Sequence, residues 1–271
     1  MFERYDDTEN LTKGVIALDK WAFFLDIDGT TAVGGRVSDE NIKAINDAVK
    51  NGHYVFICTG RPYSTSKQLL DTANLSGLIS SMGAEIIING EFARKEQVSA
   101  EFARYAAEKL MKTNFWAFMG NGENLLAINA DDNSPYMKIK TIQDFEKYYS
   151  GVTKIDMPAD ITDDIKALLE QEMDIICHPG YAEASIKGMS KSEGIEFVLN
   201  KLGLDRKFSV AVGDSLNDID MIQYAGIGVA MGNAIDEVKA IADRVTDSCE
   251  DDGVAKIIRE ITGIKNSTCK M

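Results

Sequence analysis

The sequence predicts an α/β protein with a Rossmann-like doubly wound parallel sheet core and an inserted α+β cap domain. Two observations lead to this prediction. Short apolar runs that stop at polar turns alternate with helical patterns near both ends of the chain, which is typical of buried parallel strands. The middle of the chain instead shows hairpin patterns, which imply an insertion. We place the core at residues 1–86 and 188–271 and the cap at residues 87–187.

The first core segment reads as strand, helix, strand. The apolar run from Trp21 to Leu25 ends at Asp26-Ile27-Asp28-Gly29-Thr30. Ser38 and the acidic residues after it mark a helix start, since negative charge favours the first turn. The run from Tyr54 to Cys58 predicts a second strand, which ends at Thr59-Gly60-Arg61. Short links between these elements predict a right-handed parallel unit.

The same pattern returns late in the chain. Ser190 and Glu193 have the spacing of a capping box before a helix. Phe208 to Val212 predicts a strand that ends at Gly213-Asp214, and Ser215 with Asp218 resembles a second capping box. A further strand is expected from Ile227 to Met231.

The middle of the chain predicts helix and hairpin twice, with a short helical stretch between. Helices are expected at 99–112, 141–149 and 161–172. Hairpins are expected at 115–128, turning at Asn121-Gly122, and at 174–186, turning at Pro179-Gly180.

Charge and composition exclude several classes of function. The 271 residues carry a formal net charge of −14, which repels nucleic acids and anionic lipids. No apolar run approaches the ~20 residues that cross a bilayer. The four cysteines are irregularly spaced, which argues against a zinc site or a disulfide framework and favours a cytoplasmic protein. His53 and His178 are the only histidines, too few for chemistry built on several imidazoles.

The carboxyl ends of the four predicted parallel strands meet at one crevice, and candidate residues follow three of these strands and open one helix. Each has a plainer interpretation alone, such as a turn, a helix cap or a solvated lysine. Together they favour one site. Three acids from two strand ends would repel one another unless they bind a shared Mg²⁺ ion. A lysine at the start of a helix is suited to bind a phosphate. The residues are Asp26, Asp28, Thr59, Gly60, Lys191, Asp214, Asn217 and Asp218.

The chain resembles the haloacid dehalogenase superfamily, specifically its Cof-like phosphatases with a type IIB cap. Four motifs in order carry the resemblance: Asp26-Ile27-Asp28-Gly29-Thr30, Thr59, Lys191 and Gly213-Asp214-Ser215-Leu216-Asn217-Asp218. One position departs from the pattern. The family often has Asn-Gly-Ala after the third strand, expected here at Gly77 to Met82, and this chain has Met82-Gly83-Ala84.

The resemblance implies roles for the motif residues. Asp26 would attack phosphorus, Asp28 would protonate the leaving group, and Lys191 would offset the negative charge. The Asp26 carboxylate, the Asp28 carbonyl and the Asp214 carboxylate would hold Mg²⁺, with Asp218 behind them or bound through water. The phosphate would be bound by Thr59, Gly60, Lys191 and Asn217.

We therefore expect a Mg²⁺-dependent phosphomonoesterase that forms an aspartyl phosphate. Its partner would be a small phosphorylated metabolite, with sugar phosphates favoured and neither nucleic acid nor membrane expected. Two alternatives stay open: a phosphohexomutase, and a noncatalytic phosphate-binding protein. The cap would choose the substrate through the hairpin at 174–185 and the loop from Asn133 to Tyr136. The sequence indicates no oligomeric state.

Overall fold

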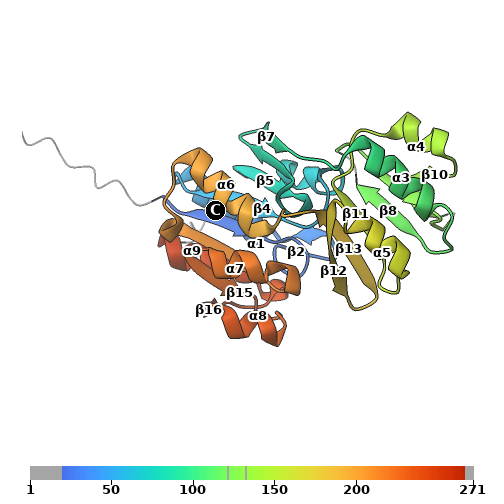
Figure 1. The fold of residues 1–271 in the computed structure, drawn as a ribbon. Coiled ribbons are helices and arrows are strands. Elements are labelled where there is room, and N and C mark those ends of the chain that lie inside the picture. The colour runs from blue at the N-terminus through green and yellow to red at the C-terminus, as the bar shows by residue number, and fades with distance from the viewer. Residues whose placement is uncertain (1–19, 121, 132, 266–271) are drawn as a thin grey trace, which may run out of the picture.

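A computed structural model describes residues 20–265 except residues 121 and 132 (Figure 1). The predictions that concern Asn121 and Cys269 lie outside this described part. Within it the chain forms two sheets with separate apolar cores, one in the core domain and one in the cap.

The core sheet confirms the predicted strand ends as neighbours. Its order is β16-β15-β14-β1-β4-β5-β6-β7, and the six strands from β16 to β5 are parallel. Their bounds are β1 Ala22–Leu25, β4 Tyr54–Cys58, β5 Gly77–Ser80, β14 Ser209–Gly213, β15 Ile227–Ala230 and β16 Arg244–Val245. All four residues of β1 are fully buried, and the rings of Phe24 and Phe56 stack at 5.5 Å between centroids. Burial on both faces explains the continuous apolar runs.

The sheet is doubly wound because its crossovers run in opposite directions. Helix α1 (Asp39–Lys50) leads from β1 to β4, whereas α7 (Ile219–Tyr224) leads from β14 away to β15. Right-handed crossovers in opposite directions place their helices on opposite faces of the sheet. Helix α9 (Gly253–Thr262) packs beside α1, and α6 (Lys191–Leu202) packs beside α7.

The edge of the core sheet differs from the expected all-parallel pattern. Strands β6 (Glu85–Ile88) and β7 (Glu91–Lys95) are antiparallel to their neighbours. The chain reverses after β5 through Ser81 and Met82, both with positive φ, so β6 returns beside β5 without a helix. The domain division at residues 87 and 187 stays a prediction, although β7 pairs in the core sheet.

The cap is a six-stranded mixed sheet of order β10-β9-β8-β11-β13-β12 covered by three helices. The helices lie where the sequence placed them: α3 Ala100–Leu110, α4 Ile142–Tyr148 and α5 Asp163–Leu169. The two predicted hairpins are β8 Ala117–Gly120 with β9 Leu125–Ile128, and β12 Met173–His178 with β13 Tyr181–Ile186. Strands β10 (Met137–Ile139) and β11 (Lys154–Pro158) were not predicted.

One face of the cap sheet packs on its helices, and the other faces the core domain. The helix-side face is apolar and includes Ala117, Met119, Ile155, Met157, Ala182 and Ala184. Alternation along each strand therefore turns Phe118, Asp156 and Glu183 to the opposite face. Figure 1 shows β11 and β13 between the core and α3, so this second face forms a roof beside the carboxyl ends of the core strands.

Smaller elements complete the described part. They are β2 Ala32–Val33, β3 Arg36–Val37, α2 Tyr63–Ser66 and α8 Asp236–Ile241, with short 3₁₀ turns between elements. None of the helices in residues 20–265 combines the length and apolar character that crossing a membrane requires.

Candidate active site

A buried lysine joins two carboxylates at the centre of the site. Lys191 Nζ lies 2.6 Å from Asp26 Oδ1 and 2.5 Å from Asp218 Oδ1, and the side chain of Lys191 is fully buried. Asp26 follows β1 directly. Lys191 is the first residue of α6, where the Ser190 hydroxyl accepts a hydrogen bond from the Glu193 N–H. The capped start of α6 therefore places the Lys191 ammonium next to Asp26 at the end of β1.

Asp214 enters the site from the end of β14. The Thr30 hydroxyl donates a hydrogen bond of 3.0 Å to Asp214 Oδ1. Gly29 has φ +76°, and a Cβ there would lie only 2.4 Å from Asp214 Oδ2. A side chain at Gly29 would therefore displace Asp214 as well as strain the backbone. This close approach explains why glycine follows the two aspartates.

Asp218 has both carboxylate oxygens engaged by the protein. Oδ1 faces Lys191, while Oδ2 accepts hydrogen bonds from the N–H groups of Asp214 (2.9 Å) and Ser215 (3.0 Å). The predicted capping box between Ser215 and Asp218 is confirmed. With its oxygens occupied, Asp218 is suited to hold the Asp214 loop and the lysine in place rather than to bind a metal directly.

The site holds more negative than positive charge. Carboxylate oxygens of Asp26, Asp214 and Asp218 lie within 4.8 Å of one another, with Lys191 as the ammonium between them. Burial, followed by the charge of Asp218, raises the pKa of Asp26 to about 7 and that of Asp214 to about 6. For Lys191, burial lowers the pKa but the Asp218 and Asp26 carboxylates outweigh it and leave it above the usual range. A divalent cation fits this surplus of carboxylate oxygens.

The turn after β4 brings the predicted phosphate ligands beside these acids. Thr59 is buried, and its hydroxyl accepts a hydrogen bond of 3.1 Å from the Arg61 N–H, so the O–H proton is free to point elsewhere. A Cβ built on Gly60 would lie 3.5 Å from Asn217 Nδ2 and 3.4 Å from Glu183 Oε2. Thr59, Gly60 and Asn217 therefore line one corner of the site, and a cap residue lies over it.

Asp28 makes a contact that sequence reasoning did not assign. Arg61 donates to both oxygens of its carboxylate, at 2.7 Å from Nε and 2.5 Å from Nη2. The side chain of Asp28 is 58% exposed, so solvent reaches it. The guanidinium of Arg61 therefore occupies the carboxylate of the predicted proton donor.

The cap contributes a charged cluster over the site. Glu183 Oε2 lies 2.6 Å from Lys154 Nζ, and Glu183 Oε1 lies 3.0 Å from His178 Nε2. Lys154 also lies 3.1 Å from Asp156 Oδ1. Burial raises the pKa of Glu183, but the charges and hydrogen bonds of Lys154 and His178 together outweigh burial and leave the pKa below its usual value. His178 therefore belongs to this cluster.

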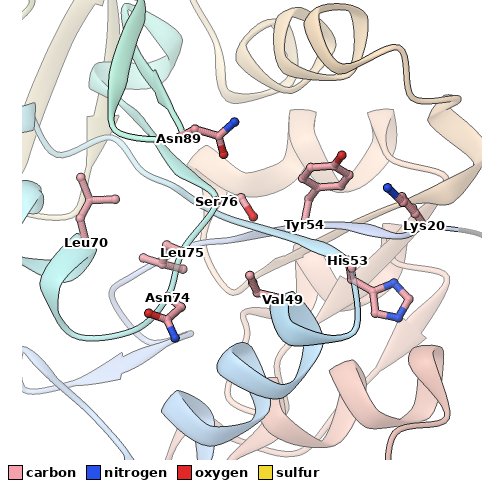
Figure 2. Close-up of a pocket in the computed structure, with 10 residues that line it drawn as sticks. Lys20, Val49, His53, Tyr54, Leu70, Asn74, Leu75, Ser76 and Asn89 are labelled. Atoms are coloured by element: carbon pink, nitrogen blue, oxygen red, sulfur yellow. The ribbon is translucent and has the colours of Figure 1, made fainter.

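A depression of about 460 Å³ at the other ends of the strands lacks this chemistry. Figure 2 shows Lys20, His53 and Tyr54 along it, at the amino ends of β1 and β4. The His53 ring Nδ1 accepts a hydrogen bond from the Trp21 N–H, and burial lowers the pKa of the imidazole. His53 thus has a structural role, and no group of acids gathers among the residues that line the depression.

A buried aspartate at the end of the first parallel strand, bridged by a lysine to one of the acids after a later strand, defines a class of phosphatases with a covering cap. The chain belongs to the haloacid dehalogenase-like hydrolases: the family model matches residues 23–258. It is a phosphatase of this family, and its structural neighbours are the Cof-like enzymes of subclass IIB.

Three comparisons illustrate the family relation. The chain is 34% identical over 240 residues to the 5-amino-6-(5-phospho-D-ribitylamino)uracil phosphatase YcsE of Bacillus subtilis, covering 87% of this chain and 93% of that protein. It is 30% identical over 264 residues to YitU of the same organism, which bears the same activity name, covering 87% and 95%. It resembles the structure of the subclass IIB sugar phosphatase BT4131 with TM-score 0.75 and 26% identity, covering 90% and 100%.

Proposed function

We propose that this protein is a Mg²⁺-dependent phosphomonoesterase that acts through a phosphoaspartate at Asp26. The contact of Lys191 Nζ with both Asp26 and Asp218 carries the proposal. An ammonium fixed beside a buried carboxylate reduces the repulsion between that carboxylate and an anionic phosphate. The hydroxyl of Thr59 and the amide of Asn217 supply further donors at the same corner.

The reaction would proceed in two displacements. Asp26 attacks phosphorus while the bond to the leaving oxygen breaks, and Asp28 gives its proton to that oxygen. Water then attacks the phosphoaspartate, Asp28 takes a proton from that water, and the P–O bond to Asp26 breaks to release inorganic phosphate. Arg61 occupies both carboxylate oxygens of Asp28, so the guanidinium has to move before Asp28 can give a proton to the leaving oxygen.

The site fits a magnesium ion by its donor set. The carboxylates of Asp26 and Asp214, with the Asp28 carbonyl, would hold it, and Asp218 would support them through the Asp214 loop. When bound, Mg²⁺ supplies positive charge that draws the phosphate oxygens in and stabilises charge on the transferring group. Lys191 remains as the fixed cation beside Asp26.

We further propose a small phosphorylated sugar or sugar alcohol as the substrate. The charged cap residues over Gly60 suit hydroxyl groups better than a flat apolar molecule. The two Bacillus subtilis relatives act, by name, on a phosphate of a ribityl chain attached to a uracil ring. That ribityl phosphate is the first candidate to assay.

The described cysteines are unpaired thiols, in keeping with a cytoplasmic location.

The proposal is tested by phosphate release from a panel of sugar, sugar alcohol and nucleoside phosphates with Mg²⁺. We expect turnover of several small polyol phosphates, and Asp26→Asn should abolish all of it. Isomerised hexose phosphate without free phosphate would indicate a mutase. A lack of turnover across the panel, with phosphate still bound, would indicate a noncatalytic binding protein.

A further inference from the structure

The loop after β15, residues 231–235, contacts both of the turns that carry the acids of the site. In the core sheet β14 lies between β15 and β1. The Ile235 N–H donates a hydrogen bond of 3.1 Å to the Asp214 carbonyl, in the turn after β14. The Asn233 side chain reaches one strand further, and its Nδ2 donates a hydrogen bond of 2.8 Å to the Gly29 carbonyl, in the turn after β1. One short loop therefore links two acidic turns that are far apart in the chain.

The orientation of the Asn233 amide is fixed from its other end. The Cys249 N–H, at the start of the 3₁₀ turn Cys249–Asp251, donates a hydrogen bond of 2.8 Å to Asn233 Oδ1. A backbone N–H can only donate, so it selects the amide oxygen and leaves the NH₂ group facing the Gly29 carbonyl. Asn233 therefore spans two backbone groups from separate segments, and its amide cannot flip without losing both hydrogen bonds.

The turn at Gly29 is only loosely held by its own hydrogen bonds. Gly29 has φ +76°, and a glycine restricts its backbone less than any other residue does. Within the turn, the hydrogen bonds from the Gly29 N–H to the Ala32 carbonyl and from the Thr30 N–H to the Ile27 carbonyl are both 3.3 Å long. The hydrogen bond from Asn233 is shorter than either. The position of the peptide between Gly29 and Thr30 therefore depends on Asn233.

That peptide lies directly against Asp214. A Cβ on Gly29 would lie 2.4 Å from Asp214 Oδ2, and the Thr30 hydroxyl donates to Asp214 Oδ1 at 3.0 Å. On its other side the peptide follows Asp28, whose carbonyl is a predicted Mg²⁺ ligand. A shift of the peptide would therefore change the spacing between the Asp28 carbonyl and the Asp214 carboxylate. Mg²⁺ requires nearly ideal octahedral geometry, so its affinity is sensitive to that spacing.

We propose that Asn233 is a positioning residue for the metal site. This inference rests on the proposed Mg²⁺ site and deepens it. Asn233 does not bind the ion. It fixes the distance between the turn after β1 and Asp214, so that the ligands are in place before the ion arrives. Partners that hold a metal ligand directly change metal affinity by about tenfold or more when they are removed. Asn233 acts through a backbone carbonyl, so its effect is smaller.

The experiment measures Mg²⁺ binding by titration calorimetry on the metal-free protein without substrate. Asn233→Ala should raise the Kd for Mg²⁺ about fivefold, the effect of one ordinary hydrogen bond on an equilibrium constant. Asn233 is exposed, so water can replace the lost hydrogen bonds, and Tm in chelator should stay close to that of the wild type. Phosphate release at limiting Mg²⁺ should fall, and saturating Mg²⁺ should restore kcat.

Two further variants test the path of the effect. Cys249→Pro removes the N–H that orients the Asn233 amide and should raise the Kd in the same direction. Proline is tolerated at the first position of a helical turn, and Ser248 before it is already extended. Asn51→Ala is the matched control. Asn51 is exposed, its Nδ2 donates to the Asp47 carbonyl at 2.7 Å, and it lies at the end of α1 away from the site, so the Kd should not change.

The outcomes distinguish this inference from the proposed function. If Asn233→Ala binds Mg²⁺ with the wild-type Kd, the inference is overturned, whether or not Tm falls, because a residue that only supports the fold would lower Tm alone. If the wild type binds no Mg²⁺, the proposed metal site fails and this inference fails with it. If the wild type binds Mg²⁺ but releases no phosphate, the phosphatase proposal fails, while the Kd of Asn233→Ala still decides the role of Asn233.

Discussion

Lys191 Nζ lies 2.6 Å from Asp26 Oδ1, although the two residues are 165 positions apart in the chain. The lysine is fully buried, so neither water nor salt screens its charge from the aspartate.

Replacing the lysine should remove activity and stability together. Lys191→Met leaves the buried Asp26 and Asp218 without their cation, and breaking a buried pair in this way costs about 3–5 kcal/mol. We expect kcat/KM to fall by roughly 100-fold or more, in line with the loss of one fixed electrostatic contact. Turnover and chemical denaturation measure the two effects. Lys256→Met is the control, since it removes an exposed lysine paired with Asp247 and should change neither.

Asp26→Asn should abolish turnover and leave the fold intact. The amide keeps the volume of the carboxylate but is not a nucleophile toward phosphorus. Because it also removes a buried negative charge, the variant should melt at or above the wild-type temperature at pH 8 without Mg²⁺. Mass spectrometry after a brief reaction should find phosphate on the wild-type peptide that contains Asp26 and none on the variant. Substantial residual activity in Asp26→Asn would contradict the covalent mechanism.

Stability without metal should fall as the pH rises from about 4 to about 7. The folded protein holds a proton on Asp26, with a pKa of about 7 against 3.8 for the unfolded chain, more tightly than the unfolded state does. Asp214, with a pKa of about 6, acts in the same direction. The contribution of these two groups to the free energy of unfolding is therefore complete below about pH 4, and it is lost as the groups ionise in the folded protein.

Magnesium should reverse that loss. A cation binds the ionised acids, so added Mg²⁺ should raise Tm more at pH 8 than at pH 5.5. Melting curves in chelator and in Mg²⁺ across this pH range measure the difference. Asp214→Asn should remove most of the shift, and an equal Mg²⁺ shift at both pH values would show that these carboxylates do not bind the ion.

Two glycines with the same kind of backbone should respond differently to alanine. Gly29 (φ +76°) and Gly34 (φ +57°) both have left-handed conformations, in which a Cβ costs about 1–2 kcal/mol. Only at Gly29 does the new Cβ also meet Asp214, at 2.4 Å, whereas nothing lies within 4 Å at Gly34. Gly29→Ala should therefore lose turnover and Mg²⁺ affinity, while Gly34→Ala should lose only the conformational part of its stability. Equal activities would show that Asp214 tolerates displacement.

The central acids were predictable because local patterns mark them. Asp26 and Asp214 each follow a fully buried strand, and parallel strands bring such ends together. Glu193 shows the limit of a local pattern. Its N–H is capped by Ser190 as expected, but its carboxylate forms an ion pair with Arg94 rather than completing the capping box.

The residues that the sequence did not reveal depend on contacts between distant segments. Arg61 reaches Asp28 across 33 positions, and Glu183 reaches Gly60 only because the cap folds back over the core. The antiparallel β6 and β7 were missed for a related reason. The turn at Met82 has φ +56°, a conformation that Asn adopts more readily than Met, so the usual signal for this reversal is absent from the chain.

The insertion of the cap also has a consequence for the order in which the molecule forms. Strand β1 pairs with β14, whose residues follow the whole cap, whereas the cap hairpins join residues close in sequence. Local pairs form faster than distant ones, because closing a long loop costs more entropy. We expect the cap to be structured on the ribosome before β14 has been synthesised. Asp26 and Lys191 would come into contact only afterwards. A chain arrested before β14 would therefore have a folded cap but no assembled active site.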